Sequence, residues 1–85
     1  MQPLQTKFTY VDGRGERRRA TVPLASGDAM ALRAEYRLAR RELSIPDALY
    51  WLRRHDSPAL KRLSSDEFRR VAVLCVRDQV EVHRG

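Results

Sequence analysis

The chain has 85 residues, a length that suits one domain with a single core and excludes two separate cores. Its apolar fraction of 42% is ordinary for a folded protein and argues against wholesale disorder. The net charge is +6, and because only Lys7 and Lys61 are lysines, the other 15 of the 17 basic residues are arginines. Arginine suits phosphate and carboxylate recognition, but a GC-rich genome produces the same bias, so both explanations stay open.

Composition also narrows the class of protein. Cys75 is the only cysteine, so an intramolecular disulfide is excluded, and no Cys/His cluster has zinc-finger spacing. Neither a signal peptide nor an apolar run of about 20 residues is present, and we expect a cytoplasmic protein without membrane, metal or cofactor. The excess of positive charge lies within residues 1–63, whereas residues 64–85 are balanced.

The first expected element is an antiparallel β-hairpin with strands at about 4–11 and 16–24. Apolar and polar residues alternate along both runs, and the core-facing positions are even-numbered in each. Directly paired residues share a face, so Asp12 should pair with Glu16, leaving a three-residue loop that ends in Gly15. This register places Phe8 opposite Ala20.

The other face of the hairpin is expected to be basic. Its residues resemble, in charge alone, the basic β-ribbons that lie along nucleic acids. The alternative is a solvated face that prevents edge-to-edge aggregation. The residues concerned are Lys7, Thr9, Arg17, Arg19 and Thr21, with Arg14 at the tip.

A helix is expected at about 28–43, with Ser26 as its cap. It carries two adjacent stripes, one apolar and one basic. The basic stripe either contacts phosphate or an acidic partner, or is the solvated side of the helix. The apolar stripe comprises Ala29, Leu32, Tyr36, Ala39 and Leu43, and the basic stripe comprises Arg33, Arg37, Arg40 and Arg41.

The next helix is expected at about 45–55, capped by Ser44 and with Pro46 in its first turn. Tyr50 and Trp51 fall off its inward stripe. Core packing is the commoner outcome for a tryptophan in so small a protein, and exposed aromatics at an interface are the alternative. The inward stripe comprises Ile45, Ala48, Leu49 and Leu52.

Two further helices are expected at about 58–63 and 65–79. Ser57 would cap the first, with Pro58 at its first position, and Ser64 with Glu67 forms a capping box for the second. The run 71–76 is rich in β-branched residues, so the span 68–83 could also form a β-hairpin. A helix is the preferred interpretation.

These elements predict a single α+β domain over residues 1–85, with an N-terminal hairpin followed by three to four helices. The segment from Leu32 to Leu63 resembles a helix-turn-helix in outline, but it lacks the usual turn glycine, so no family is assigned. No catalytic signature surrounds His55 or His83, and Cys75 lies in an apolar run where thiols are inert. We therefore do not expect an enzyme.

Two binding functions remain, and either would be compatible with a homodimer. One is a small regulatory protein that binds DNA or RNA through phosphate contacts. The other is a protein-binding adaptor or inhibitor that uses Tyr50 and Trp51 as anchors for an acidic or nucleic-acid-binding protein partner. The predicted phosphate contacts are Arg17, Arg19, Arg33, Arg37, Arg40, Arg41, Arg53, Arg54, Lys61 and Arg62.

Overall fold

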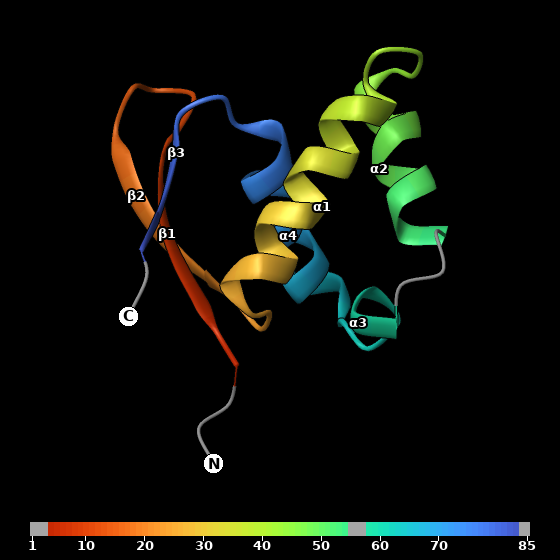
Figure 1. Cartoon of the computed structure of the whole chain (residues 1–85). Coiled ribbons are helices and arrows are strands. Elements are labelled where there is room, and N and C mark those ends of the chain that lie inside the picture. The colour runs from red at the N-terminus through yellow and green to blue at the C-terminus, as the bar shows by residue number, and fades with distance from the viewer. Residues whose placement is uncertain (1–3, 55–57, 84–85) are drawn as a thin grey trace.

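The computed structural model describes residues 4–54 and 58–83. It confirms the α+β class, with three strands in the antiparallel order β2-β1-β3 (Figure 1). The elements in chain order are β1 (Thr6–Val11), β2 (Arg17–Val22), α1 (Ser26–Ala39), α2 (Ile45–Arg54), α3 (Pro58–Lys61), α4 (Ser65–Val76) and β3 (Val80–His83).

The N-terminal hairpin has the predicted register and loop. Phe8 pairs with Ala20. The backbone amide of Asp12 donates to the carbonyl of Glu16 (2.9 Å), and Gly15 has a φ of 81°. This positive φ costs glycine little, which is why a three-residue loop can close here. The strands are slightly shorter than predicted because the chain leaves the ladder after Val22, just before Pro23.

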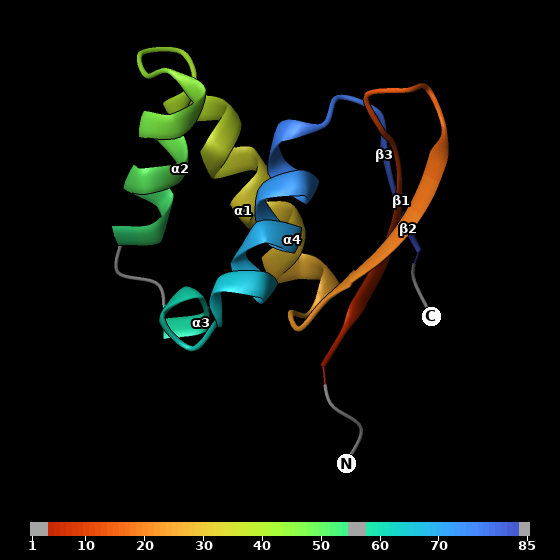
Figure 2. The same cartoon turned by 180° about the vertical axis from the view of Figure 1, so that it is seen from behind.

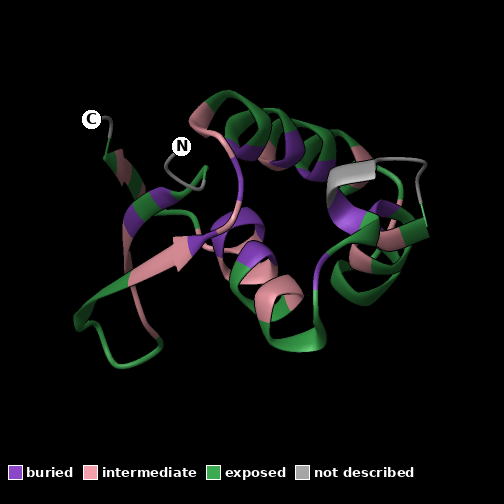
Figure 3. Cartoon of the chain, turned by 90° about the horizontal axis from the view of Figure 1, so that it is seen from below, coloured by how far each residue is buried: buried purple, intermediate pink, exposed green. Residues whose placement is uncertain are grey.

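The helices cover one face of the sheet in two successive layers (Figures 1 and 2). α1 and α4 lie next to the sheet, and α2 and α3 lie beyond them. Most even-numbered side chains of the sheet enter the core, where Phe8 and Val22 are fully buried, whereas Arg18 near the hairpin tip is exposed. Viewed from below, exposed residues follow the hairpin tip and the outer sides of the helices (Figure 3). The remaining core comes mainly from Leu32, Tyr36, Leu52, Leu60, Val71 and Leu74.

The C-terminal region differs from both interpretations of the span 68–83. The capping box of Ser64 and Glu67 starts α4 as predicted, and the β-branched run lies on this helix. The helix ends at Val76, not at residue 79, and the chain returns as β3, which pairs with β1. Tertiary contact decides this outcome, since β1 offers an open edge and Val80 and Val82 cover its apolar side.

Several predicted helix ends also shift. The cap of α1 is Ala25, whose methyl group cannot form a capping hydrogen bond, so the predicted cap at Ser26 is wrong; the hydroxyl of Ser26 accepts a hydrogen bond from that of Thr6 (3.4 Å). α1 ends at Ala39 and is followed by a tight turn, so the predicted extension to residue 43 is wrong. α3 ends at Lys61, before the predicted end at residue 63. The predicted cap at Ser57 lies outside the described residues, as do His55 and the last position of the helix at 45–55.

The α2 region corrects the expectation for the aromatic pair. Ser44 accepts a hydrogen bond from the backbone amide of Asp47 and caps the helix as predicted. Ala48 and Leu52 are fully buried, but Ile45, predicted to point inward, is largely exposed. The prediction that Tyr50 and Trp51 pack in the core is wrong, since 62% and 40% of their surfaces are exposed. α2 is the outermost layer, so only one of its sides is covered.

Candidate nucleic-acid interface

The outward face of the sheet is left uncovered by the helices. Its residues are the odd-numbered positions of β1, β2 and β3, because side chains alternate between the two faces of a strand. The register lines Arg19, Thr9 and Glu81 across the three strands, and Thr21, Lys7 and His83 in the neighbouring row. We call this surface, completed by Val11 and Arg17, the sheet face.

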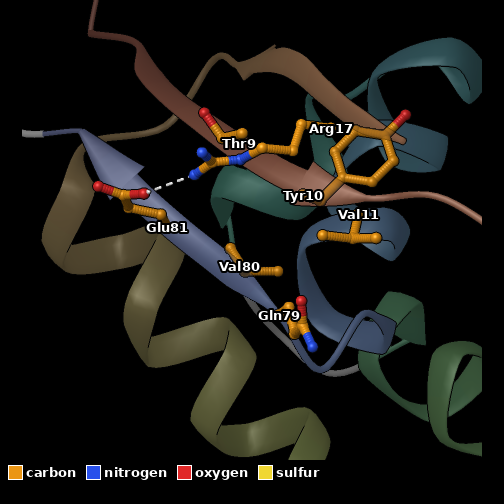
Figure 4. Close-up of a pocket in the computed structure, with 7 residues that line it drawn as sticks. All are labelled: Thr9, Tyr10, Val11, Arg17, Gln79, Val80 and Glu81. Atoms are coloured by element: carbon orange, nitrogen blue, oxygen red, sulfur yellow. Dashed lines mark hydrogen bonds and ion pairs between the residues drawn. The ribbon is translucent and has the colours of Figure 1, made fainter. Parts of the chain in front are cut away.

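The sheet face carries three cations, Lys7, Arg17 and Arg19, against the single carboxylate of Glu81. Arg17 reaches over Thr9 toward Glu81, with 3.3 Å between Nη2 and Oε2 (Figure 4). Both side chains of this ion pair are well exposed, at 73% and 64%, so solvent screens it and it adds little stability. Lys7 and Arg19 make no ion pair within the described residues.

Two shallow hollows lie along the sheet. The first, of about 350 Å³, is bordered by Arg17, Glu81 and the chain entering β3 (Figure 4). The second, of about 410 Å³, is bordered by Lys7, Arg19, Thr21 and His83. The Nε2 atom of His83 is hydrogen-bonded to the hydroxyl of Thr9 over 2.6 Å. The polar lining of the second hollow thus includes the cations of Lys7 and Arg19 and the hydroxyl of Thr21, groups that contact phosphate oxygens, beside the apolar residues Phe8 and Ala20.

The hairpin tip next to this face is held by Asp12. Its carboxylate accepts hydrogen bonds from the backbone amides of Arg14 (2.8 Å) and Glu16 (3.0 Å) and from Nε of Arg18 (2.7 Å). The guanidinium of Arg18, followed by these amides, lowers the pKa of Asp12 to about 2. The charge of Arg18 is thus neutralised within the tip, whereas Arg14 stays exposed at its end.

The predicted arginine stripe of α1 divides into a structural residue and an exposed group. Arg33 is half-buried and donates to the backbone carbonyls of Leu74 (3.4 Å), Arg77 (3.1 Å) and Asp78 (3.1 Å), which ties α1 to the chain between α4 and β3. Burial, with the nearby charge of Arg37, lowers the pKa of Arg33. Arg37, Arg40 and Arg41 are exposed near the C-terminal end of α1, where cations also suit the helix dipole.

The remaining predicted contacts lie on the helical layer farthest from the sheet. Arg53 stacks 4.5 Å from the centre of the Phe68 ring, and Arg54 stacks on Tyr50 while donating to its hydroxyl (2.8 Å). Lys61 and Arg62 are exposed on α3 and just after it. The ten predicted residues therefore occupy three surfaces, and only Arg17 and Arg19 share the sheet face.

Sequence reasoning missed His83 as a member of this surface. The signal was present, because Val80, Glu81, Val82 and His83 alternate with a period of two, but four residues were too few to establish a strand. Cys75 is buried as expected, and burial raises the pKa of its thiol to about 12. No cluster of three or more metal-ligating side chains occurs within residues 4–54 and 58–83, and no described helix is long and apolar enough to cross a membrane.

Comparison with protein-family models, curated proteins and solved structures finds no match to this chain.

Proposed function

We propose that this chain is a small cytoplasmic regulatory protein that binds nucleic acid through the phosphate backbone. The observation that carries the proposal is the uncovered sheet face, on which Lys7, Arg17 and Arg19 meet only one carboxylate. A flat cationic surface of this kind neutralises phosphates and releases their counterions, which is the main source of sequence-independent affinity.

A double-stranded ligand is favoured over a single strand. Proteins that hold single strands stack the bases on aromatic side chains. The two aromatic residues of β1, Phe8 and Tyr10, belong to the opposite face of the sheet, where their ring centroids lie 5.9 Å apart. Among the residues described, the sheet face has no phenylalanine, tyrosine or tryptophan side chain. Backbone contacts to a duplex fit this surface better than base stacking.

The decisive experiment compares two double variants that remove equal charge from different surfaces. Lys7→Gln/Arg19→Gln alters the sheet face, and Arg37→Gln/Arg41→Gln alters the exposed arginines of α1. Binding of a fluorescent DNA duplex, an RNA duplex and a single strand is measured by anisotropy over a series of salt concentrations. Circular dichroism confirms that both variants remain folded.

The sheet-face variant should lose roughly tenfold in duplex affinity for each residue removed, and its plot of log K against log salt should become shallower by about 2. The α1 variant should retain nearly the affinity and salt slope of the parent chain. A larger loss in the α1 variant would assign the interface to that helix instead. Absence of salt-dependent binding to every nucleic acid would refute the proposed function.

A further inference from the structure

A second surface lies between α1 and α2, at the other end of the molecule from the sheet. Here the two helices and the turn that joins them border a hollow of about 370 Å³. We call it the α1–α2 groove. Its lining residues are Glu35, Leu38, Ala39, Glu42, Leu43 and Trp51.

The lining of the α1–α2 groove is mostly apolar and accessible. Leu38 is 58% exposed, and Trp51 is the exposed tryptophan described above. Ala39 and Leu43 are half-buried and connect the floor of the groove to the core. Exposed leucine and tryptophan side chains around one hollow are typical of a surface that buries them against a partner, because burial removes apolar area from water.

The spacing along α1 indicates the shape of that partner. Glu35, Leu38 and Ala39 stand at positions i, i+3 and i+4 of α1, the spacing that places side chains on one face of a helix, and Glu42 follows in the turn after α1. The helical part of this run, from Glu35 to Ala39, covers about 6 Å along the axis of α1, or about one turn. Trp51 of α2 forms the opposite wall, so the groove has the form of a seat for a third helix.

Charge indicates the chemistry of the partner. The groove has one carboxylate on α1, that of Glu35, and one in the turn after α1, that of Glu42, and neither makes an ion pair within the part of the chain that the structure describes. No lysine or arginine lines the groove. This acidic border stands out on a chain of net charge +6, and it favours a cationic partner.

We propose that the α1–α2 groove binds an amphipathic helix of another protein, with apolar anchors on Leu38 and Trp51 and lysine or arginine side chains beside Glu35 and Glu42. This keeps Trp51 as an anchor and gives the partner a basic character, whereas the sequence suggested an acidic or a nucleic-acid-binding protein. Tyr50 does not line the groove; Arg54 covers its ring and donates to its hydroxyl. The inference is independent of nucleic-acid binding.

The test uses the full chain and two synthetic amphipathic helices about four turns long. Both carry leucines on one face, flanked by lysines in one peptide and by glutamates in the other. Binding is followed by the fluorescence of Trp51, the only tryptophan of the chain, and by calorimetry. The lysine peptide should bind at least about tenfold more tightly than its glutamate twin, a difference of about 1.4 kcal/mol.

Three variants assign the binding to the groove. Leu38→Ser should weaken the lysine peptide about tenfold, and Glu35→Lys/Glu42→Lys should reverse the preference toward the glutamate peptide. Met30→Ser is the matched control, because Met30 is an exposed apolar residue of the same helix that lies outside the groove. It should bind as the parent chain does.

Four outcomes would overturn the proposal. These are binding of neither peptide, equal binding of both, an equal loss in Leu38→Ser and Met30→Ser, and light scattering that shows a dimer dissociated by Leu38→Ser. The last result would assign the groove to self-association. Circular dichroism shows whether each variant keeps its fold. If Leu38→Ser does not fold, the Glu35→Lys/Glu42→Lys variant still tests the proposal.

Discussion

The sheet face and the α1–α2 groove are opposite kinds of surface on one small chain. The sheet face is cationic, with only shallow hollows, and most apolar residues of the strands lie on the opposite face, in the core. The groove is hollowed and apolar, with carboxylates at its border. A net charge of +6 therefore describes neither surface, since it averages a basic sheet with an acidic groove. The comparison shows that charge must be assigned to faces before it is used to infer a partner.

The largest expected effect is a loss of stability on the sheet side of the molecule when Arg33 is replaced. Replacing it with methionine keeps an apolar stem but removes the donors to Leu74, Arg77 and Asp78. We expect the free energy of unfolding to fall by about 1–3 kcal/mol. Amide hydrogen exchange in β3 should accelerate, whereas the fluorescence of Trp51 should not change.

The control for this prediction is Arg37→Met, one turn later on the same helix and exposed. It should change stability by less than about 0.5 kcal/mol. If both variants destabilise equally, or if β3 exchanges at its original rate in Arg33→Met, then Arg33 does not hold the sheet and the two regions are not separable in this way.

A smaller effect is expected on the groove side, at Arg53. Its guanidinium stacks on Phe68 and so joins α2 to α4. Arg53→Met should cost about 0.5–1 kcal/mol of unfolding free energy. In heteronuclear spectra, the amide signals of α2 should shift and those of β1 and β2 should stay. Arg54→Met removes a contact within α2 only, and it should cost about 0.2–0.5 kcal/mol.

The smallest expected effect is a loss of stability at low pH, and it involves only the hairpin tip on the sheet side. The pKa of Asp12 is about 2 in the folded chain against an ordinary 3.8, so its ionised form is favoured by folding. The stabilisation is present above about pH 4 and is lost as the pH falls toward 2. Arg18→Gln should raise the pKa of Asp12 toward its ordinary value, as followed by NMR titration of the carboxyl carbon. An unchanged titration would show that Arg18 does not hold the hairpin tip.

How far the sequence predicts this structure depends on the range of the contacts involved. The hairpin register followed from parity because Phe8 and Ala20 are close in sequence and one turn fixes their pairing. The capping box of Ser64 and Glu67 could be predicted for the same reason, since its two residues are close in sequence. The pairing of β3 with β1 could not be predicted in this way, because the paired residues lie 70 or more positions apart and the four residues of β3 carry little pattern.

The candidate site was predictable to a similar extent. Alternation placed Arg17 and Arg19 on one face with Lys7, and the structure keeps them there. Helical spacing placed Arg33 beside the other arginines of α1, but whether a side chain meets solvent or a neighbouring carbonyl depends on a helix 40 residues later. The exposure of Trp51 was equally non-local, since it depends on how many layers cover α2.

The central position of β1 has a consequence for the order of folding. One edge of β1 pairs with β2 across a three-residue loop, so this half of the ladder closes early and at low entropic cost. The other edge pairs with β3, as in the pairing of Phe8 with Val82, and because these residues lie 74 positions apart, we expect this contact to form after that with β2. Until then β1 presents an open edge, the usual starting point for pairing with another chain. In the folded chain, the guanidinium of Arg33 holds the segment leading into β3 and so helps to keep this edge of β1 covered.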